Sequence, residues 1–172
     1  MIDLFPKADA LGPAPSYNLS AFVPEVVIMV AGVNDFIEAT FDSAFQVTST
    51  AEARLPPQQQ WLAEYVALIR QIRQAYPQAA ITSMAWPLEI SLTLHDDWQM
   101  AMLYSTWMVA AASHVDAAGI PNHHFLQLDS LTPGAASPSN YCKSHPNAAA
   151  HTQIAAQLSK FIQGVVPSFA AS

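Results

Sequence analysis

Glycine is scarce in this sequence, and its scarcity excludes two kinds of nucleotide site. Only 5 of the 172 residues are glycine, and none lie close enough together to form a phosphate-binding loop. A dinucleotide-binding fingerprint and a P-loop both need clustered glycines, because the backbone has to approach the phosphates closely. Neither motif occurs, and no cofactor is predicted.

Basic residues are also few. Lys and Arg total 6 against 13 Asp and Glu, which gives a formal net charge of −7. Binding to a phosphate backbone needs a positive surface, so nucleic acids and anionic membranes are not expected partners. Charged residues make up 11% of the chain and apolar residues 52%. This composition excludes intrinsic disorder, which requires low hydrophobicity and high charge. It also indicates that some apolar surface remains exposed to solvent.

A single cysteine, Cys142, excludes an intramolecular disulfide and a cysteine-based zinc site. Two interpretations of Cys142 stay open: a solitary buried thiol, or, in a secreted protein, a thiol paired outside this chain. No apolar run reaches the roughly 18 residues needed to span a membrane. The sequence after Met1 also lacks the basic and apolar regions of a signal peptide.

The rest of the sequence alternates between strand and helix patterns. Residues 1–24 are typical of an irregular lead-in, 25–166 of one domain and 167–172 of a tail. The predicted elements are strands at 25–32, 79–86 and 123–129, helices at about 56–76, 98–118 and 146–164, and loops at 37–55 and 130–144. This alternation predicts an α/β fold with a parallel sheet and right-handed crossovers.

Several local features follow from the same patterns. The run 25–32 is short, continuous and β-branched, which favours a strand buried on both faces. Gly119 is a candidate helix C-cap, and Pro146 is expected at a first helical position, where its missing N–H costs nothing. Apolar stripes are expected on the first helix at Leu62, Tyr65, Val66, Ile69 and Ile72 and on the second at Trp98, Met102, Trp107 and Val109.

Sites in open α/β sheets form beyond the carboxyl ends of the strands. Gly32, Asn34 and Asp35 follow the first predicted strand. The amide of Asn34 is a suitable oxyanion donor, although the segment is equally suited to an ordinary turn. His145 and Pro146 precede the last helix, where the helix dipole favours a neutral imidazole that can act as a base. An N-cap role is the alternative for His145.

Together these two segments resemble the SGNH, or GDSL-type, esterase family. Gly32, Asn34 and Asp35 are similar to its third conserved block, and His145 with Pro146 is similar to its fifth. The surrounding sequence is similar to carbohydrate esterases that remove acetyl groups. The resemblance implies a three-layer, flavodoxin-like SGNH fold, a small-molecule or carbohydrate ester as substrate, and secretion. It also implies that Asn34 donates to the oxyanion, that His145 is the general base, and that Gly32 and Asp35 shape the turn that aims Asn34.

The nucleophile block of that family is missing from this sequence. Ser16 and Ser20 are the only serines before Gly32, and neither follows an apolar strand. The 31 preceding residues are too few for two strands and a crossover helix, so the N-terminal strands of the fold are expected to be absent. The strand at 26–30 then becomes an exposed apolar edge.

Three functions are compatible with this pattern. The first is a carboxylic ester hydrolase of which this chain is the C-terminal two-thirds, the nucleophile remaining unknown. The second is an inactive SGNH-like ligand-binding domain, and the third is a fragment with no function by itself. An Asp usually stands three residues before the family's His, but Cys142 occupies that position. Asp129 is the nearest upstream orienting candidate, and a strand-end turn is its alternative role.

The remaining aromatic and histidine residues are ambiguous. His123 and His124 are adjacent in a predicted strand, so they point to opposite faces and cannot chelate one ion. No metal site is predicted. His151 is expected at the surface of the last helix. Trp86 and Trp98 are suited either to the core or to a sugar-stacking surface.

Overall fold

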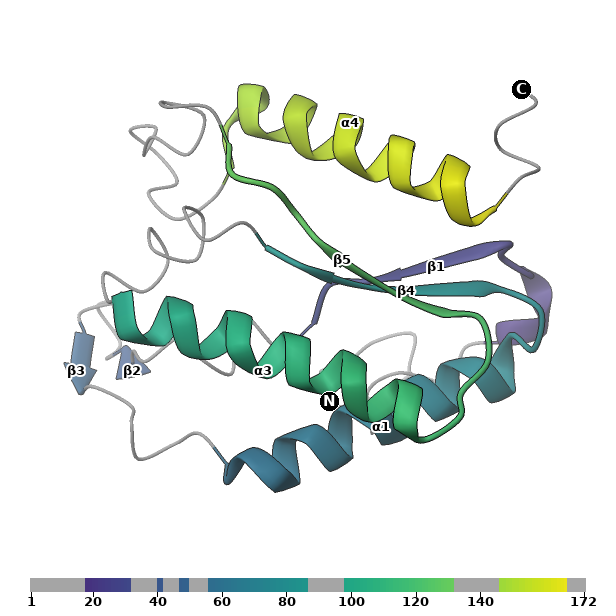
Figure 1. Ribbon diagram of the computed structural model, residues 1–172, viewed down its shortest axis with the longest axis horizontal. Coiled ribbons are helices and arrows are strands. Elements are labelled where there is room, and N and C mark those ends of the chain that lie inside the picture. Colours follow the sequence, from purple (N-terminus) through teal and green to yellow (C-terminus); the bar gives the residue numbers. More distant parts are fainter. Residues whose placement is uncertain are drawn as a thin grey trace.

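The computed structural model describes residues 18–31, 40–41, 47–49, 56–86, 98–131 and 146–166. Apart from two short strands between β1 and α1, strands and helices alternate along the chain, as the sequence predicts (Figure 1). The elements are η2 (Leu19–Ala21), β1 (Val26–Met29), β2 (Thr40–Phe41), β3 (Val47–Ser49), α1 (Gln58–Ala75), β4 (Ala80–Ala85), α3 (Trp98–Ala117), β5 (His123–Gln127) and α4 (Ala148–Val165).

The main sheet has three parallel strands in the order β1-β4-β5. Val26 pairs with Ala80, and Ile81 pairs with His123. Helices α1 and α3 pack on one face and α4 on the other, which gives three layers (Figure 1). The predicted three-layer α/β fold with a parallel sheet is therefore confirmed.

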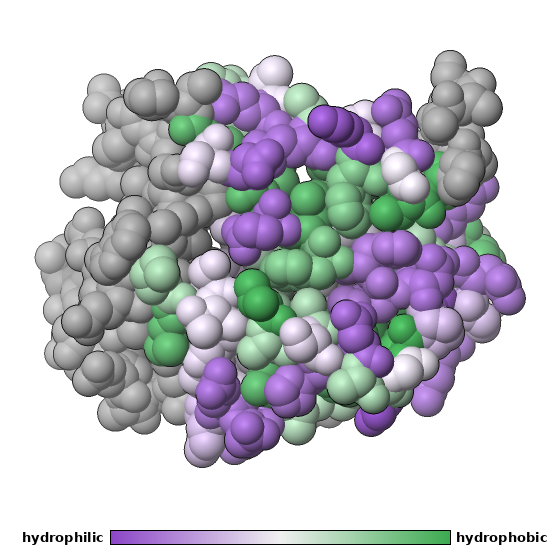
Figure 2. All heavy atoms as spheres, viewed as in Figure 1, coloured by the Kyte–Doolittle hydropathy of each residue, from purple (hydrophilic) through white to green (hydrophobic). Residues whose placement is uncertain are grey.

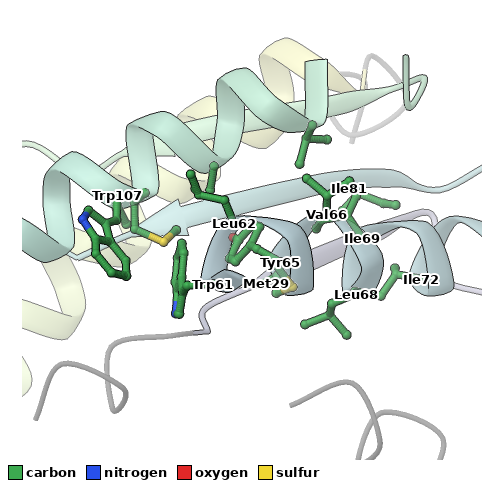
Figure 3. Close-up of a cluster of buried hydrophobic side chains, with 14 of the residues drawn as sticks. Met29, Trp61, Leu62, Tyr65, Val66, Leu68, Ile69, Ile72, Ile81 and Trp107 are labelled. Carbon is green, nitrogen blue, oxygen red and sulfur yellow. The ribbon is translucent and has the colours of Figure 1, made fainter. Parts of the chain in front are cut away.

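The larger core lies between α1, α3 and the central strand β4 (Figure 3). All six residues of β4 are buried, because helices cover it on both faces. Ile81 and Ala85 join the larger core, whereas Met84 faces α4. The predicted stripe of α1 is confirmed, and it extends to Trp61 and Leu68, which are also buried.

The predicted stripe of α3 is partly wrong. Met102 is 42% exposed and Val109 is 51% exposed, whereas Trp107 is buried as expected. The core is instead contacted by the opposite side of the helix, whose buried residues are Tyr104, Trp107, Met108, Ala111, Ala112 and Val115. Apolar residues surround this helix on nearly all sides, so its sequence lacks the polar stripe that would reveal the outer face. The side chain of Trp98 lies outside the described residues.

Strand β1 is not buried on both faces, which corrects the expectation for the run 25–32. Within the described part of the chain β1 pairs only with β4 and so lies at the edge of the sheet. Met29 is buried against the larger core, but Ile28 is 37% exposed and Val30 is 39% exposed. The reason is that α4 packs over β4 and β5 and leaves this side of β1 uncovered. In the described part of the chain the expected apolar edge is therefore present.

The stretch 37–55, predicted as a loop, contains a short β-hairpin. Strands β2 and β3 pair antiparallel, with Thr40 opposite Ser49. Two and three residues are too few for an alternating pattern to be recognised, although Thr40, Phe41 and Val47 are residue types that favour strands.

The helix ends follow local chemistry. Gly119 has a φ of 65°, and the amides of Gly119 and Ile120 bond back to α3 carbonyls, so the predicted C-cap is confirmed. The predicted place of Pro146 is two positions wrong, because Asn147 is the N-cap of α4 and Ala148 is its first helical residue. The Oδ1 of Asn147 accepts from the amide of Ala150 at 3.0 Å, and Pro146 precedes this cap. An Asn oxygen satisfies a free helix N–H, which a proline ring cannot do.

Arg73 ties two turns together at the amino-terminal edge of the sheet. Its guanidinium donates to carbonyls on the α1–β4 turn and on the α3–β5 turn, over distances of 2.7 to 3.2 Å. Asn122 stands at the second turn with a φ of 52°, a conformation that asparagine tolerates. The two crossovers are thus fixed at the edge that is opposite to the predicted site.

Candidate functional site

The carboxyl ends of the three parallel strands meet at one edge of the sheet, where the chemistry is expected. Helix α4 begins at the same edge, because Leu131, which follows β5, packs in one cluster with Ala150 of its first turn (Figure 1). Ala31 and Pro146, the described residues next to the two segments that the sequence selects, therefore lie toward this edge.

The predicted oxyanion donor and base themselves lie outside the described residues. This holds for Asn34 with its neighbours Gly32 and Asp35, and for His145. Cys142 lies outside them as well. Their roles remain predictions, and the described part of the chain contributes the surroundings of the site.

Asp129 lies at this edge, two residues beyond β5. Its amide donates to Oε1 of Gln157 on α4 at 2.7 Å, and Nε2 of Gln157 donates to its carbonyl at 3.4 Å. Asp129 is exposed, so its backbone is held by α4 while the residue stays accessible to solvent. Orientation of His145 by Asp129 stays a prediction.

Ser20 does not lie at the carboxyl edge. It belongs to η2, which precedes β1, and so it lies at the opposite end of that strand. Its hydroxyl donates to Oδ1 of Asn18 at 2.7 Å. A nucleophile needs to lie beside the oxyanion donor and the base, and Ser20 does not meet that condition. Ser16 lies outside the described residues.

Trp86 is the first residue after the central strand. Its side chain is half-buried and packs against both the larger core and the smaller cluster beneath α4. The backbone oxygen of Trp86 accepts from Nε2 of Gln127, the last residue of β5, at 3.1 Å. The exposed side-chain amide of Gln127 thus holds the backbone of the residue that ends the central strand. The sequence alone does not relate Gln127 to Trp86.

A second polar group combines a buried serine and a buried histidine with an exposed aspartate. The Oγ of Ser83 and Nε2 of His123 share a hydrogen bond of 2.9 Å, and Nδ1 of His123 lies 3.6 Å from Oδ1 of Asp116. A serine that contacts a histidine, which in turn faces an aspartate, resembles a catalytic triad. However, Ser83 is 1% exposed and the His123 side chain is also 1% exposed, so no ester can reach the hydroxyl. Ser83 and His123 thus form a buried hydrogen-bonded pair, and Asp116 approaches it from the surface with a side chain that is 72% exposed.

Burial shifts the titration of this network. Desolvation lowers the pKa of His123, and the neighbouring Asp116 carboxylate partly opposes that shift. Desolvation also raises the pKa of Tyr65. Burial raises the pKa of Tyr104 to about 12. The sequence pattern does not identify this network, because its members come from separate elements.

His124 points to the other face of the sheet from His123, as the alternation of a strand predicts. Its Nε2 lies 3.0 Å from Oδ1 of Asn122, and its ring meets Phe161 of α4 edge-on. Among the described residues no group of three His, Cys, Asp or Glu is arranged to hold a metal ion. His151 is exposed on α4, as predicted.

A pocket of about 310 Å³ opens at the other end of the sheet, between the start of β1 and the end of α4. Pro24, Asn122 and Val166 are among its lining residues. It is therefore separate from the carboxyl edge. None of the described helices combines the length and apolar character that crossing a membrane requires.

The chain matches the model of the GDSL-like lipase/acylhydrolase family over residues 6–153. The chain belongs to this family. The match includes both segments selected at the carboxyl edge, those of Asn34 and His145. The family is one of ester-hydrolysing enzymes, as its description states. A search of curated proteins gives no match.

This GDSL-family chain is also similar to solved carbohydrate esterases. A family two carbohydrate esterase from Clostridium thermocellum in complex with cellohexaose has a TM-score of 0.67 at 22% identity, covering 94% of this chain and 42% of its own. A family two carbohydrate esterase from Cellvibrio japonicus has 0.61 at 16%, covering 91% and 38%. The acetyl xylan esterase Est2A from Butyrivibrio proteoclasticus has 0.61 at 16%, covering 95% and 45%.

These likenesses establish the fold of the GDSL-family chain. At such low identity they carry the architecture and no detail of specificity. The chain spans about two fifths of the length of the first of these structures. Its own three-layer arrangement, with a parallel sheet and helices on both faces, agrees with theirs.

Proposed function

We propose that this chain supplies the oxyanion donor and the general base of a carboxylic ester hydrolase. The observation that carries the proposal is the shared edge. The Asn34 segment follows β1, and the His145 segment precedes α4. Ala31 and Pro146 are the described residues next to these segments, and both lie toward the carboxyl edge of the sheet. The family match over both segments supports the assignment.

The chemistry follows from these residue types. A serine hydroxyl, from a residue not yet identified, attacks the ester carbonyl carbon while the imidazole of His145 takes its proton. The carbonyl π electrons move onto oxygen, and the side-chain amide of Asn34 donates to the resulting oxyanion. Collapse of the intermediate expels the alcohol, which takes the proton from His145. Water then removes the acyl group by the same steps, with Asp129 as the candidate that orients His145.

The substrate that we propose is an acetylated carbohydrate or another short acyl ester. The sequence resemblance to acetyl-removing esterases supports it, as does the similarity in fold to an acetyl xylan esterase and to an esterase that was solved with cellohexaose. Both solved proteins are longer than this chain, so their substrates are a guide to the first compounds to test.

The test uses the full chain with 4-nitrophenyl acetate and with acetylated xylo-oligosaccharide. His145→Ala is expected to lower kcat by about 100- to 10,000-fold because the base is lost. Asn34→Ala is expected to lower kcat by about 100- to 1,000-fold because one oxyanion donor is lost. His151→Ala is the matched control, since it removes an exposed histidine of α4, and its activity should stay unchanged. Near-normal turnover by His145→Ala would refute the assignment.

A separate experiment identifies the nucleophile. The chain is treated with a serine-directed fluorophosphonate, and the labelled peptide is sequenced by mass spectrometry. A single labelled serine, whose replacement by alanine abolishes turnover, would identify a nucleophile within this chain. The missing nucleophile block predicts the other outcome, in which no serine of this chain is labelled and the nucleophile is supplied from outside it.

A catalytically inactive ligand-binding domain is the second candidate function. The observation that favours it is the position of Ser20, which lies before β1 and away from the carboxyl edge. In that case the chain binds a carbohydrate but shows neither turnover nor fluorophosphonate labelling. A chain that neither folds nor binds would instead be a fragment with no function by itself.

A further inference from the structure

The segment Asn18-Leu19-Ser20 carries a motif that the proposed ester hydrolysis does not use. It has the pattern Asn-x-Ser with a middle residue other than proline, which is the acceptor pattern for an N-linked glycan. Of the five asparagines in the sequence, Asn18 alone has a serine or threonine two positions later. So short a pattern also arises by chance, and its surroundings in the fold decide whether a glycan fits there.

The fold leaves both ends of this motif at the surface. Asn18 and Ser20 are exposed, whereas Leu19 between them is half-buried and packs against the larger core. The amide of Ala21 donates to the carbonyl of Asn18 at 3.0 Å and closes the turn of η2. Leu19 thus anchors the turn while the two residues that the modification requires stay accessible. A glycan on Asn18 displaces no core residue.

The two polar residues of the motif contact each other. The Oγ of Ser20 donates to Oδ1 of Asn18 at 2.7 Å, and the backbone amide of Ser20 donates to the same oxygen at 3.1 Å. Such an Asx turn depends only on residues that are close in the sequence, so it can form before the rest of the chain folds. Both bonds use the side-chain oxygen. The Nδ2 atom, which carries the sugar in an N-linked glycan, takes part in neither of them.

Apolar surface is concentrated directly after the motif. Six large hydrophobic residues are exposed in the described part of the chain, and four of them lie between residues 22 and 30: Phe22, Val23, Ile28 and Val30. The residues 22–25 link η2 to β1 and span at most about 18 Å when extended. A glycan on Asn18 therefore lies beside the exposed start of the edge strand. A bulky hydrophilic group there opposes pairing with another chain.

The motif is far from the site of the proposed hydrolysis. It precedes β1, so it lies at the amino-terminal end of that strand, whereas the Asn34 segment follows the carboxyl end. A glycan on Asn18 leaves the carboxyl edge open to a substrate. The modification also agrees with the secretion that the sequence resemblance implies, because N-linked glycans are found on surface segments of secreted proteins.

We propose that Asn18 is the acceptor of an N-linked glycan, and that this glycan shields the apolar surface at the start of β1. The donor is a lipid pyrophosphate-linked oligosaccharide. Nδ2 of Asn18 forms a bond to the anomeric carbon of the first sugar and loses one proton. The bond from that carbon to the pyrophosphate oxygen breaks, and its electron pair leaves with the pyrophosphate. The inference is independent of ester hydrolysis.

Mass spectrometry of the protein isolated from its source tests the modification directly. Peptide N-glycosidase in heavy-oxygen water releases the glycan and leaves an aspartate with one heavy oxygen atom in place of Asn18. We expect this label at position 18 after treatment, and the mass of a glycan on the same peptide before treatment. Unmodified Asn18 in the protein from its source would overturn the proposal.

Variants assign the glycan to Asn18. The full chain is expressed in yeast behind a cleavable secretion signal, and its gel mobility is compared before and after glycosidase treatment. The wild type and Ser20→Thr, which keeps the acceptor pattern, should shift, whereas Asn18→Asp and Ser20→Ala should not. Asn18→Asp keeps the oxygen that accepts from Ser20, so it removes the acceptor nitrogen and preserves the turn. A glycan that persists in Asn18→Asp would refute the assignment.

Sedimentation velocity tests the shielding. Enzymatic release converts the glycosylated Asn18 to aspartate, so the deglycosylated wild type and Asn18→Asp have the same sequence and serve as controls for each other. At equal concentration both should contain a larger fraction of dimers and higher species than the glycosylated wild type. Equal association of the glycosylated and deglycosylated chains would overturn the shielding.

Discussion

His123 shows how a single buried side chain makes the stability of this protein depend on pH. Its Nε2 bonds to Ser83 on β4, and its Nδ1 faces Asp116 on α3. Arg73 of α1 and the adjacent His124 also act on it, and both oppose a positive charge on its ring. With Nδ1–H toward the carboxylate, Nε2 accepts from the Ser83 hydroxyl, so the neutral imidazole satisfies both partners.

We expect the free energy of unfolding to decrease as the pH falls below 6.5. Burial lowers the pKa of His123, so the unfolded chain takes up a proton at a pH where the folded chain resists it. The contribution is complete above pH 6.5 and is lost progressively below it, by at most about 1.4 kcal/mol per pH unit for one proton. Urea unfolding between pH 7.5 and 5 measures this dependence.

The variant His123→Gln removes the titrating group and keeps a side chain that can bond to Ser83. Its unfolding free energy should vary less with pH than that of the wild-type chain. His151→Gln is the control, because His151 is exposed on α4, and its pH dependence should equal that of the wild type. Equal pH profiles for His123→Gln and the wild type would contradict the role of His123.

At the scale of elements, two glycines near helix ends serve opposite purposes. Gly119 follows α3 with a φ of 65°, and its amide and that of Ile120 satisfy the carbonyls of Asp116 and Val115. Gly164 lies inside the last turn of α4 without a positive φ, and an added Cβ there would meet no atom within 4 Å. The first glycine is required by the backbone, and the second is not.

Alanine at these two positions should therefore change stability in opposite directions. Gly119→Ala forces an L-residue into the left-handed region and should destabilise by about 1 to 2 kcal/mol. Gly164→Ala should stabilise by about 0.5 to 1 kcal/mol, because alanine loses less conformational entropy in a helix. Chemical denaturation of the two variants compares them directly. A stabilising Gly119→Ala would show that the C-cap conformation is not maintained in solution.

At the scale of the whole molecule, the low charge of the sequence has a visible consequence. Both outer strands of the described sheet, β1 and β5, pair on one side only. Figure 2 shows apolar surface between α3 and α4, where β5 runs, and at β1 the side chains of Ile28 and Val30 are exposed. Unpaired backbone beside apolar side chains is a template for pairing with another chain.

We expect the chain to self-associate through β1 as its concentration rises. Ile28→Lys places a charge on this edge and should increase the fraction of monomer in sedimentation velocity, because a lysine opposes edge-to-edge pairing. Met102→Lys is the matched control, since Met102 is exposed on α3 and lies away from the β1 edge. It should leave the association unchanged. Equal association of Ile28→Lys and the wild type would exclude β1 as the contact.

Much of the fold could be predicted from the sequence because its signals are local. Pro56-Pro57 and Pro77 bound α1, and the run before Gly32 is too short and too β-branched for a helix. The family segments at Asn34 and His145 could likewise be selected, since a strand end and a helix start are recognisable in a sequence. In contrast, the outer face of α3 could not be assigned, because Met102 and Val109 are as apolar as the residues that face the core.

The sequence by itself determined the order of the strands and helices that build the main sheet and its layers, the parallel sheet, and the two segments that resemble the conserved blocks of the family. Those features depend on residue types within a few positions of each other. Only the tertiary structure decided that β1 is an edge strand, that Ser83, His123 and Asp116 form one network, and that Trp86 lies beside Gln127. These relations join residues far apart in the chain, and they arise from how the layers pack, which no local pattern encodes.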